Sequence, residues 1–536
     1  MGVSTVQSAA VFGLRVELVN VEADVGNGLP AFHMVGYLSS EVKEAGERVR
    51  TAIRNSGLEF PAKKTVINLS PATIRKRGAA FDLPIAIAIL TSLGTIAQED
   101  TKGLLILGEL GLDGAVHKVP GVLPVVMEAK KQEICRCMIP LENEQEARLV
   151  DGMEVTGVQT LKEAFEWIKG TKKKRLSQQK KKGMEVSKGK VYGEERECAE
   201  EKPDFQDICG QNAVKRAVEV AVAGGHNLLM VGPPGSGKTM IAKRIPTILP
   251  PLTLEESLEI TKIYSIVGQI DGQEPLIRTR PFRSVHHTVT KTALTGGGLI
   301  PSPGEITLAH GGVLFLDELP EFRKPVLEVL RQPLEERKIW ISRTHGTYLF
   351  PANFMLVCAM NPCPCGEFGS GNCTCTPGQV RGYLGKLSQP FLDRMDLCVE
   401  APKVTYAALK GKMSGRKTAE RKGETSAQIR QRVCAAREIQ NRRFSDSGTG
   451  FNAMMSIREV EQYCKLGDKE EALIQMAYER LGLTARSYHK ILKVARTIAD
   501  LAGSEKIESM HLAEAIGYRS FDQKYRGGMW MELSTE

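Results

Sequence analysis

The sequence predicts an α/β protein organised around a parallel sheet, and two apolar stretches support this prediction. One stretch, residues 227–231 (NLLMV), leads into the glycine-rich segment 232–239 (GPPGSGKT), after which residues 240–245 can begin a helix. The other, residues 313–316 (VLFL), ends in two acids. Short apolar runs bounded by turn residues are typical of strands that are buried on both faces of a parallel sheet. As a third observation, the charged segment 169–203 separates this region from an earlier domain.

The composition is that of an ordinary globular protein. The chain has 536 residues, of which 42% are hydrophobic and 25% charged, and this length suits about three domains. No apolar run is long enough to cross a membrane, and the first residues lack the basic start and apolar core of a signal peptide. We therefore expect a cytoplasmic protein without a membrane partner. The net charge of +9 permits nucleic-acid binding, although part of the excess lies in segment 169–203.

Residues 1–168 predict a first domain of α/β or α+β class. Alternating or continuous apolar residues predict strands, and apolar residues at helical spacing predict helices. The predicted strands are residues 14–18, 21–25, 65–70 and 104–110. The predicted helices are residues 42–53 and the strongly apolar segment 81–93.

The segment 76–90 (KRGAAFDLPIAIAIL) resembles the Lon-protease-like domain that precedes several bacterial ATPases. The resemblance implies an α+β domain with the ribosomal S5 domain 2-like fold. The segment contains no serine or cysteine where Lon carries its nucleophile. We therefore expect a docking or scaffold domain without peptidase activity.

Residues 169–203 predict a linker. Basic residues gather between positions 172 and 182 and acidic residues between 194 and 201, with few apolar side chains to bury. Such a segment could touch a nucleic-acid backbone as a basic arm or serve as a solvated tether, and we favour the tether.

Residues 232–239 match the phosphate-binding loop G-x-x-x-x-G-K-[ST] in the required context of strand, loop and helix. The glycines let backbone N–H groups turn inward around phosphate oxygens, and the helix N-terminus adds a partial positive charge. Lys238 is expected to reach the β- and γ-phosphates of ATP, and Thr239 to ligate Mg²⁺. The predicted nucleotide-binding residues are Gly232, Pro233, Pro234, Gly235, Ser236, Gly237, Lys238 and Thr239.

Two further strand ends predict the catalytic half of this site. The strand 313–316 ends in Asp317 and Glu318, and ligands of open α/β sheets bind at the carboxyl ends of strands. Asp317 is expected to hold Mg²⁺ through water, and Glu318 to polarise the attacking water as a general base. The strand 355–360 (MLVCAM) ends at Asn361, which can orient the water jointly with Glu318. The alternative for Asn361 is an ordinary Asn-Pro turn.

Arg394, within 389–397 (QPFLDRMDL), is a candidate arginine finger. A guanidinium group can neutralise the charge that develops on the γ-phosphate. If this group acts on a neighbouring subunit, it requires an oligomer. The alternative is a surface ion pair with Asp393 or Asp396.

Together these residues resemble the magnesium-chelatase-like AAA+ ATPases, specifically the bacterial YifB/ComM group. The resemblance covers nearly the whole chain. The matching segments are GPPGSGKT (232–239), RPFRSVHHT (280–288), GGGLIPSPGEITLAHGGVLFLDELPEF (296–322), NPCPCG (361–366), CTPGQVRGYL (375–384) and QPFLDRMDL (389–397).

The resemblance implies a central P-loop AAA+ domain of αβα class over residues 204–402. It implies a homo-oligomeric ring, commonly a hexamer, that binds ATP between subunits. It further implies a motor that promotes branch migration of DNA joints during natural transformation, as ComM does. In this group Asn361 corresponds to sensor 1, Arg394 to the arginine finger and Arg486 to the sensor 2 arginine. Whether Arg486 acts within its own subunit or on a neighbour stays open.

The C-terminal part of the chain predicts a helical lid subdomain. Residues 403–425 are polar and basic and predict a mobile segment, whereas residues 426–528 predict helices. Apolar residues between positions 488 and 499 recur at helical spacing, and Thr484 can cap the start of this helix. Arg486 lies in its first turn, where the lid would approach the nucleotide.

Two insertions fit a DNA motor. Residues 280–308 separate the two nucleotide motifs, and residues 338–350 (KIWISRTHGTYLF) predict a hairpin before the Asn361 strand. In the family such hairpins point into the ring pore, where basic residues can contact DNA phosphates. The candidate DNA-binding residues are Lys338, Arg343 and His345. Alternatively, the hairpin serves only subunit packing, and His286 and His287 of the first insertion are buried and hydrogen-bonded.

A cluster of cysteines predicts a structural metal site. Its members are Cys363, Cys365, Cys373 and Cys375, in the pattern C-x-C-x₇-C-x-C. Glycines between the two pairs let the loop fold back, and four thiolates bind Zn²⁺ tetrahedrally. Since C-x-C is tighter than the usual spacing, a loop of reduced, metal-free cysteines is the alternative.

Three functional hypotheses follow. The favoured one is a ring-forming, Mg²⁺-dependent ATPase that translocates or remodels branched or single-stranded DNA, with helicase or branch-migration activity. The second is the motor subunit of a metal-insertion chelatase that acts on a protein partner; the first domain argues against it, since the resemblance to chelatase subunits is expected only in the central and C-terminal regions. The third is an ATP-switched scaffold, which the complete set of water-activating and sensor residues argues against.

Overall fold

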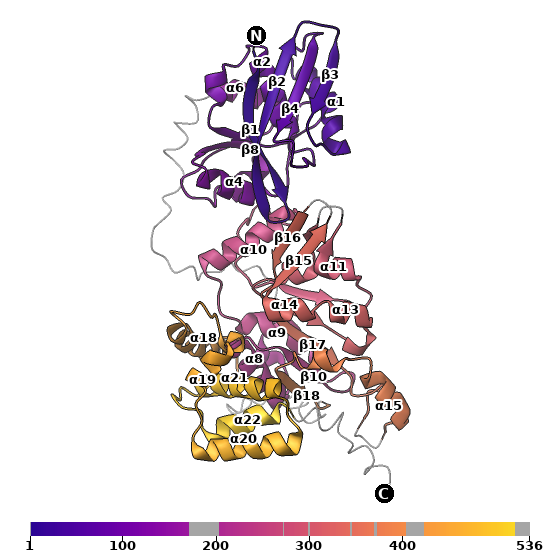
Figure 1. The fold of residues 1–536 in the computed structure, drawn as a ribbon, viewed down its shortest axis with the longest axis vertical. Coiled ribbons are helices and arrows are strands. Elements are labelled where there is room, and N and C mark those ends of the chain that lie inside the picture. Colours follow the sequence, from indigo (N-terminus) through magenta and orange to yellow (C-terminus); the bar gives the residue numbers. More distant parts are fainter. Residues whose placement is uncertain are drawn as a thin grey trace, which may run out of the picture.

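The computed structural model describes residues 2–170, 203–271, 273–298, 301–343, 346–368, 372–403 and 423–519. We call residues 2–170 the front region, residues 203–403 the central region and residues 423–519 the C-terminal helices. The front region lies at one end of the molecule and the C-terminal helices lie at the other, with the central region between them (Figure 1). Most of the predicted linker, positions 404–422 and the last residues of the predicted lid lie outside the described residues. Across the described part of the chain, no helix has the length and apolarity needed to cross a membrane.

The front region is built on a mixed sheet of seven strands in the order β3-β4-β2-β1-β5-β8-β9. Strand β2 pairs antiparallel with both β1 and β4, whereas β5, β8 and β9 run parallel. The strands are β1 (Ser4–Phe12), β2 (Arg15–Gly26), β3 (Ala31–Val35), β4 (Lys64–Ser70), β5 (Leu104–Ile106), β8 (Arg136–Pro140) and β9 (Glu154–Val158). The helices and short turns are α1 (Ser40–Asn55), α2 (Asp82–Ser92), α3 (Gln98–Thr101), α4 (Val122–Lys131), η1 (Leu141–Asn143), α5 (Glu144–Ala147) and α6 (Leu161–Ile168).

Helix packing explains the apolar runs of the front region. Helices α1, α2 and α6 share one core with one face of the sheet, and α4 covers the other face. Every residue of α2 is buried, as its apolar run predicts. The prediction of a single strand over 104–110 is wrong, because the chain turns at Gly108 to bond with the start of α2. Residues beyond this turn form β6 (Glu109–Leu110), which pairs with β7 (Val116–His117) instead of joining the large sheet.

The central region contains a parallel sheet of five strands in the order β11-β14-β17-β10-β18. This sheet, with helices on both faces, confirms the predicted α/β class. The strands are β10 (Leu228–Val231), β11 (Phe282–Val285), β14 (Val313–Leu316), β17 (Met355–Met360) and β18 (Leu397–Glu400). The surrounding elements are η2 (Phe205–Asp207), α8 (Asn212–Gly224), α9 (Lys238–Ile248), α10 (Leu254–Ile266), α11 (Lys291–Thr295), β12 (Gly296–Gly297), β13 (Ser302–Pro303), α12 (Glu305–Leu308), η3 (Leu319–Glu321), α13 (Lys324–Glu328), α14 (Arg331–Glu336), α15 (Pro377–Leu384) and α16 (Gln389–Leu392).

The predicted hairpin is present and lies against the front region. Strands β15 (Lys338–Arg343) and β16 (Gly346–Pro351) pair antiparallel beside the lower end of β1 and β2 (Figure 1). At the β1–β2 turn, Gly13 has a φ of +59°, and a Cβ built on it would lie 3.1 Å from Tyr348 and 3.2 Å from Phe350. Only glycine fits both the left-handed backbone and the close approach. The β1–β2 turn therefore packs directly against the side chains of β16.

A second contact joins the front region to α10. The backbone N–H of Gly121 donates to the carbonyl of Ser265 at 2.9 Å, and Lys118 Nζ donates to the carbonyl of Ile270 at 2.8 Å. The Ser265 hydroxyl donates to the carboxylate of Glu146, a buried side chain that also accepts from the backbone of Leu123. Because buried polar groups are costly without partners, these bonds favour one relative placement of the two regions.

The C-terminal helices complete one face of the central core. Helices α18 and α21 share a core with α8, α9 and one face of the parallel sheet. The elements are α18 (Ser426–Arg443), η5 (Asn452–Met454), α19 (Ile457–Tyr463), α20 (Asp468–Leu481), α21 (Ala485–Leu501) and α22 (Ser509–Gly517). The predicted cap at Thr484 is confirmed, since its side chain accepts from the backbone N–H of Ser487.

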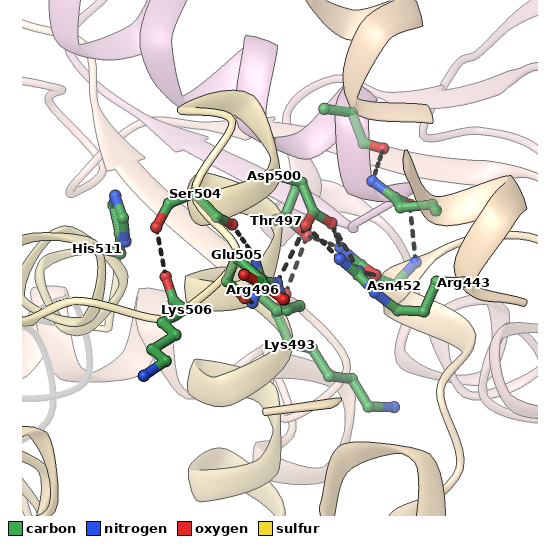
Figure 2. A network of polar contacts seen from close by, with 12 residues as sticks. Arg443, Asn452, Lys493, Arg496, Thr497, Asp500, Ser504, Glu505, Lys506 and His511 are labelled. Atoms are coloured by element: carbon green, nitrogen blue, oxygen red, sulfur yellow. Dashed lines mark hydrogen bonds and ion pairs between the residues drawn. The ribbon is translucent and has the colours of Figure 1, made fainter. Parts of the chain in front are cut away.

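A buried polar network holds these helices together (Figure 2). Asp500, whose side chain is 0% exposed, pairs with Arg443 and Arg496 and accepts from Asn452 at 2.8 Å. Thr497, one turn earlier, is bonded to His226 at 2.8 Å. His226 lies two residues before β10, the strand that leads to the glycine-rich loop, so the network connects the C-terminal helices to the start of that strand.

Candidate nucleotide-binding and hydrolysis site

The glycine-rich loop follows β10 and ends at the first turn of α9. Gly235 and Gly237 have φ values of +75° and +87°, the left-handed region that glycine adopts without strain. Successive N–H groups in such a turn form a concave site for anions at the start of a helix. Lys238 Nζ donates to the carbonyls of Gly232 and Pro233 at 2.6 and 2.9 Å, so its ammonium lies inside the loop. The loop therefore fits the triphosphate of a nucleotide.

The two predicted Mg²⁺ ligands lie together. Thr239 Oγ1 donates to Asp317 Oδ2 at 2.6 Å, which joins the end of the loop to the carboxyl end of β14. Oxygen ligands of this kind suit Mg²⁺, which bridges protein and phosphate oxygens in nucleotide sites. Burial lowers the pKa of Lys238, and the nearby Asp317 carboxylate opposes this effect.

Glu318 and Asn361 line one cavity beside the loop. Glu318 has a φ of +51°, an unusual value for a residue other than glycine and one that clusters at functional sites. Asn361 Oδ1 lies 3.3 Å from Lys238 Nζ, at the tip of β17. The cavity, of about 410 Å³, is lined by Glu318, Glu321, Asn361, Pro364, Gln379, Tyr383 and Lys386. It has room for water molecules next to Glu318 and Asn361.

His287 is a contact of the site that sequence reasoning missed. Its Nδ1 atom lies 3.3 Å from Glu318 Oε2, and its ring stands 4.1 Å from that of His286. The insertion that holds these histidines was expected to serve a DNA motor or to bury them with hydrogen bonds. His286 is exposed, and only His287 contacts Glu318. The topology contained the signal, because His287 follows β11 and carboxyl ends of parallel strands meet at one edge of a sheet.

Arg394 and Arg486 lie together at the other edge of the sheet. Both guanidinium groups contact Glu335 Oε1, at 2.7 Å for Arg394 and 2.5 Å for Arg486. Arg394 precedes the amino end of β18, whereas the loop follows the carboxyl end of the adjacent parallel strand β10. The ion pair expected as the alternative for Arg394 is present, but its partner is Glu335 instead of Asp393 or Asp396. Asp396 pairs with Lys490 at 2.7 Å, and Asp393 accepts from Gln389.

Lys338 and Arg343 lie on the hairpin, and His345 lies outside the described residues. Lys338 and Arg343 are exposed, and Arg343 Nε donates to the carbonyl of Gly298 at 3.3 Å, which links the hairpin to the first insertion. Between them, Trp340 is 49% exposed. Because side chains alternate along a strand, Lys338, Trp340 and Ser342 share the outer face of β15.

The cysteine loop brings its thiols together next to the glycine-rich loop. The Sγ atoms of Cys363, Cys365, Cys373 and Cys375 all lie within 4.8 Å of one another. Burial raises the pKa of Cys363, whereas the backbone N–H groups of Glu367 and Thr374 lower that of Cys365. A Cβ built on Gly366 would lie 2.4 Å from the Cδ atom of Pro234, so the two loops touch.

These features define a P-loop ATPase of the AAA+ class. They are the order of the parallel sheet, the phosphate-binding loop, the acid pair Asp317 and Glu318, and Asn361 at the tip of its strand. Three family models match the chain: "Magnesium chelatase, subunit ChlI" over residues 204–409, "Subunit ChlI of Mg-chelatase" over 21–143, and "Magnesium chelatase, subunit ChlI C-terminal" over 423–519. The chain belongs to the magnesium-chelatase-like AAA+ family that includes ComM and YifB. Membership implies ATP and Mg²⁺ as cofactors, for which the loop and its Mg²⁺ ligands are suited.

Two similar proteins match nearly the whole chain, and a third matches about a quarter of it. The chain is 43% identical to "Competence protein ComM" of Haemophilus influenzae, over 97% of this chain and 98% of that protein. It is 42% identical to "Uncharacterized protein YifB" of Escherichia coli, over 98% of each. "Lon protease 2" of Bacillus subtilis is 30% identical over 26% of this chain and 27% of its own length. Since a chelatase model also matches residues 21–143, the expectation that chelatase resemblance stops short of the first domain is wrong.

Proposed function

We propose that this protein is a ring-forming ATPase that uses hydrolysis of Mg²⁺-bound ATP to move or remodel DNA, in recombination or natural transformation. The proposal of a ring rests on one observation: the proposed catalytic groups are divided between the two ends of the strands in the central sheet. The phosphate-binding loop, Asp317 and Glu318 lie at the carboxyl edge, whereas Arg394 and Arg486 meet at Glu335 beyond the amino edge.

Within one subunit, the carboxyl edge binds and prepares the nucleotide. Lys238 and the loop N–H groups hold the phosphates, while Thr239 and Asp317 hold Mg²⁺ and neutralise charge. Glu318 accepts a proton from the attacking water, and Asn361 orients that water from the next strand. His287, which follows the neighbouring strand β11, positions the Glu318 carboxylate through its Nδ1 atom.

The two arginines are suited to act on a neighbouring subunit. Strands rise about 3.3 Å per residue, so the amino edge lies about 10 Å from the carboxyl edge across these short strands. A head-to-tail interface with rotational closure would bring this arginine pair to the next subunit's γ-phosphate. The commonest such ring in the class is a hexamer. We assign Arg394 as the arginine finger and Arg486 as its partner in trans.

DNA is the favoured substrate because of the outer face of β15. An exposed aromatic ring flanked by a cation is the usual surface for single strands, since any base can stack on the ring while the cation meets a phosphate. Lys338 and Trp340 supply these groups, and Arg343 lies at the end of the same strand. The similarity to a competence protein agrees with this substrate.

A chelatase-type motor that acts on a protein partner is the second candidate. The chelatase descriptions of all three family models favour it. The two candidates differ in what accelerates hydrolysis, because a DNA motor responds to DNA and a chelatase motor to its protein partner.

The test is ATP hydrolysis by the purified full chain, measured with no DNA, with forked DNA and with four-way DNA. Glu318→Gln is the control, because it keeps the size of the side chain and removes the general base. We expect DNA to stimulate hydrolysis, and both Glu318→Gln and Trp340→Ala to abolish the stimulation. Trp340→Ala should keep its basal rate, since this residue lies away from the cavity. Basal hydrolysis that no DNA changes would reject the DNA motor and favour a protein partner. Nucleotide binding without any hydrolysis would favour an ATP-switched scaffold.

A further inference from the structure

We propose that Cys363, Cys365, Cys373 and Cys375 bind one Zn²⁺ ion, and that this ion locks the loop after Asn361 against the phosphate-binding loop. The first part concerns metal binding and stands independently of activity. The second part rests on the proposed ATPase function.

The thiol geometry fits tetrahedral zinc. A Zn–S bond of about 2.3 Å in a tetrahedron places the sulfur atoms about 3.8 Å apart. The structure places Cys363 Sγ 3.3 Å from Cys365 Sγ and 3.9 Å from Cys373 Sγ, and it places Cys365 Sγ 3.6 Å from Cys373 Sγ. These separations far exceed a disulfide bond of about 2.05 Å. All four cysteines are free thiols with one shared centre.

The surroundings resemble a structural site. Cys363 is fully buried and belongs to the core that includes Met360 and Val231, and the other three cysteines are partly buried. The backbone N–H of Cys365 donates to Cys375 Sγ at 3.4 Å, a bond that supports the charge of a ligating thiolate. A closed set of four protein ligands leaves no open position for a substrate, as in structural zinc sites.

The site lies where it can control the shape of the hydrolysis cavity. The first cysteine pair follows Asn361, and the second pair comes just before the Thr376 cap of α15, whose Gln379 and Tyr383 line the cavity together with Asn361. An ion that joins the two pairs therefore ties the segment after Asn361 to α15, and residues of both segments line the cavity.

The loop also touches the nucleotide loop directly. Gly366 has a φ of +81° and approaches Pro234 so closely that a Cβ would lie 2.4 Å from its ring. Pro364, between the first two ligands, lines the cavity with Glu318. Closing a flexible loop costs conformational entropy, and metal–ligand bonds offset this cost. Without the ion, Asn361 would lose the rigid support of the residues that follow it.

Metal content is the first measurement. We expect the full chain, purified without metal-affinity resin, to carry about one zinc per chain by plasma mass spectrometry. Cys373→Ser and Cys375→Ser should each lower bound zinc about tenfold or more, since even outer-sphere changes cost 10- to 100-fold in affinity. Cys135→Ser, which removes an exposed thiol of the front region, is the matched control and should keep full occupancy.

A second probe identifies the ligands and guards against misfolding. Cobalt added to the zinc-depleted wild type should give the thiolate-to-metal and d–d absorption bands of a tetrahedral sulfur site. Those bands should be lost in Cys375→Ser, while circular dichroism matches the wild type. Zinc-free wild-type protein with no cobalt spectrum would overturn the proposal, and so would disulfides between these cysteines in the freshly purified chain.

Hydrolysis tests the coupling separately. Cys375→Ser and chelator-treated wild type should retain nucleotide binding and lose most of their hydrolysis, and zinc should restore only the wild type. Unchanged hydrolysis after loss of zinc would overturn the coupling. Zinc-loaded wild-type protein that never hydrolyses ATP would count against the proposed function and leave the metal site in place.

Discussion

Replacing Arg394 by alanine should lower kcat for ATP hydrolysis about 10³-fold or more, because arginine fingers contribute about 10³ to 10⁵. A 10³-fold loss corresponds to about 4 kcal/mol of transition-state stabilisation. Nucleotide binding within the subunit should change little, since the loop lies at the other edge of the sheet. Arg394 itself is held by Glu335 and by the carbonyl of Arg331, so its removal leaves the parallel strands intact.

The sharper consequence is complementation between two inactive variants. Glu318→Gln lacks the general base but keeps its arginine, and Arg394→Ala lacks the arginine but keeps its loop. If Arg394 acts on the neighbouring subunit, one kind of mixed interface has all its groups. In that interface the Arg394→Ala subunit supplies the loop with an intact Glu318, and the Glu318→Gln neighbour supplies the arginine. In a random equal mixture about one quarter of the interfaces in a head-to-tail ring meet this condition. Because each interface holds one hydrolysis site, the mixture should recover about a quarter of the wild-type rate.

A matched control uses two variants of the same edge. Lys238→Ala and Glu318→Gln both damage the carboxyl edge, so no arrangement of these two subunits creates an intact site. Their mixture should remain inactive, and fluorescence energy transfer between labelled subunits should confirm that exchange takes place in both mixtures. Exchange without recovery in the Arg394→Ala mixture would refute action in trans.

Three further results are expected. Asp500→Ala should lower the free energy of unfolding by about 3–5 kcal/mol, since it removes the buried carboxylate that pairs with the buried Arg496 and the partly buried Arg443. Urea titration measures this change, and a cost under about 1 kcal/mol would contradict the buried network. Burial lowers the pKa of His226 to about 4 from 6.5, so the stability due to its neutral form is complete above pH 6.5 and is lost as the pH falls toward 4. Between pH 7.5 and 5 this loss amounts to about 2 kcal/mol, and it should be absent from His226→Asn. His287→Ala should lower kcat about tenfold without changing ATP affinity, and His287→Asn should recover part of the rate by hydrogen bonding to Glu318.

The glycine-rich loop was predictable because its groups lie within a few consecutive residues. The loop 232–239 needs only a strand before it and a helix after it, and both are present. The positions of Asp317 and Asn361 were predictable for a related reason, since each follows an apolar strand and parallel strands present their carboxyl ends at one edge of the sheet. The cysteine pairs were visible by spacing alone, and the fold adds their proximity to one another.

Contacts between distant segments could not be predicted in the same way. Glu335 holds both Arg394 and Arg486, yet nothing in its neighbourhood in the sequence distinguishes it from Asp393 or Asp396. Several carboxylates were chemically equivalent partners, and only the tertiary structure, which places α14 next to Arg394 and the first turn of α21, selects among them.

The sequence alone therefore determined the fold class and the positions of the glycine-rich loop and of the polar strand ends, because local motifs and the period of buried strands encode them. Only the tertiary structure decided that His287 supports Glu318, that the turn at Gly13 packs against the hairpin, and that the arginines lie away from their own loop. The physical reason is that these contacts join segments far apart in the chain. These contacts form only when the sheets and helices pack together, and no local pattern of residues predicts that packing.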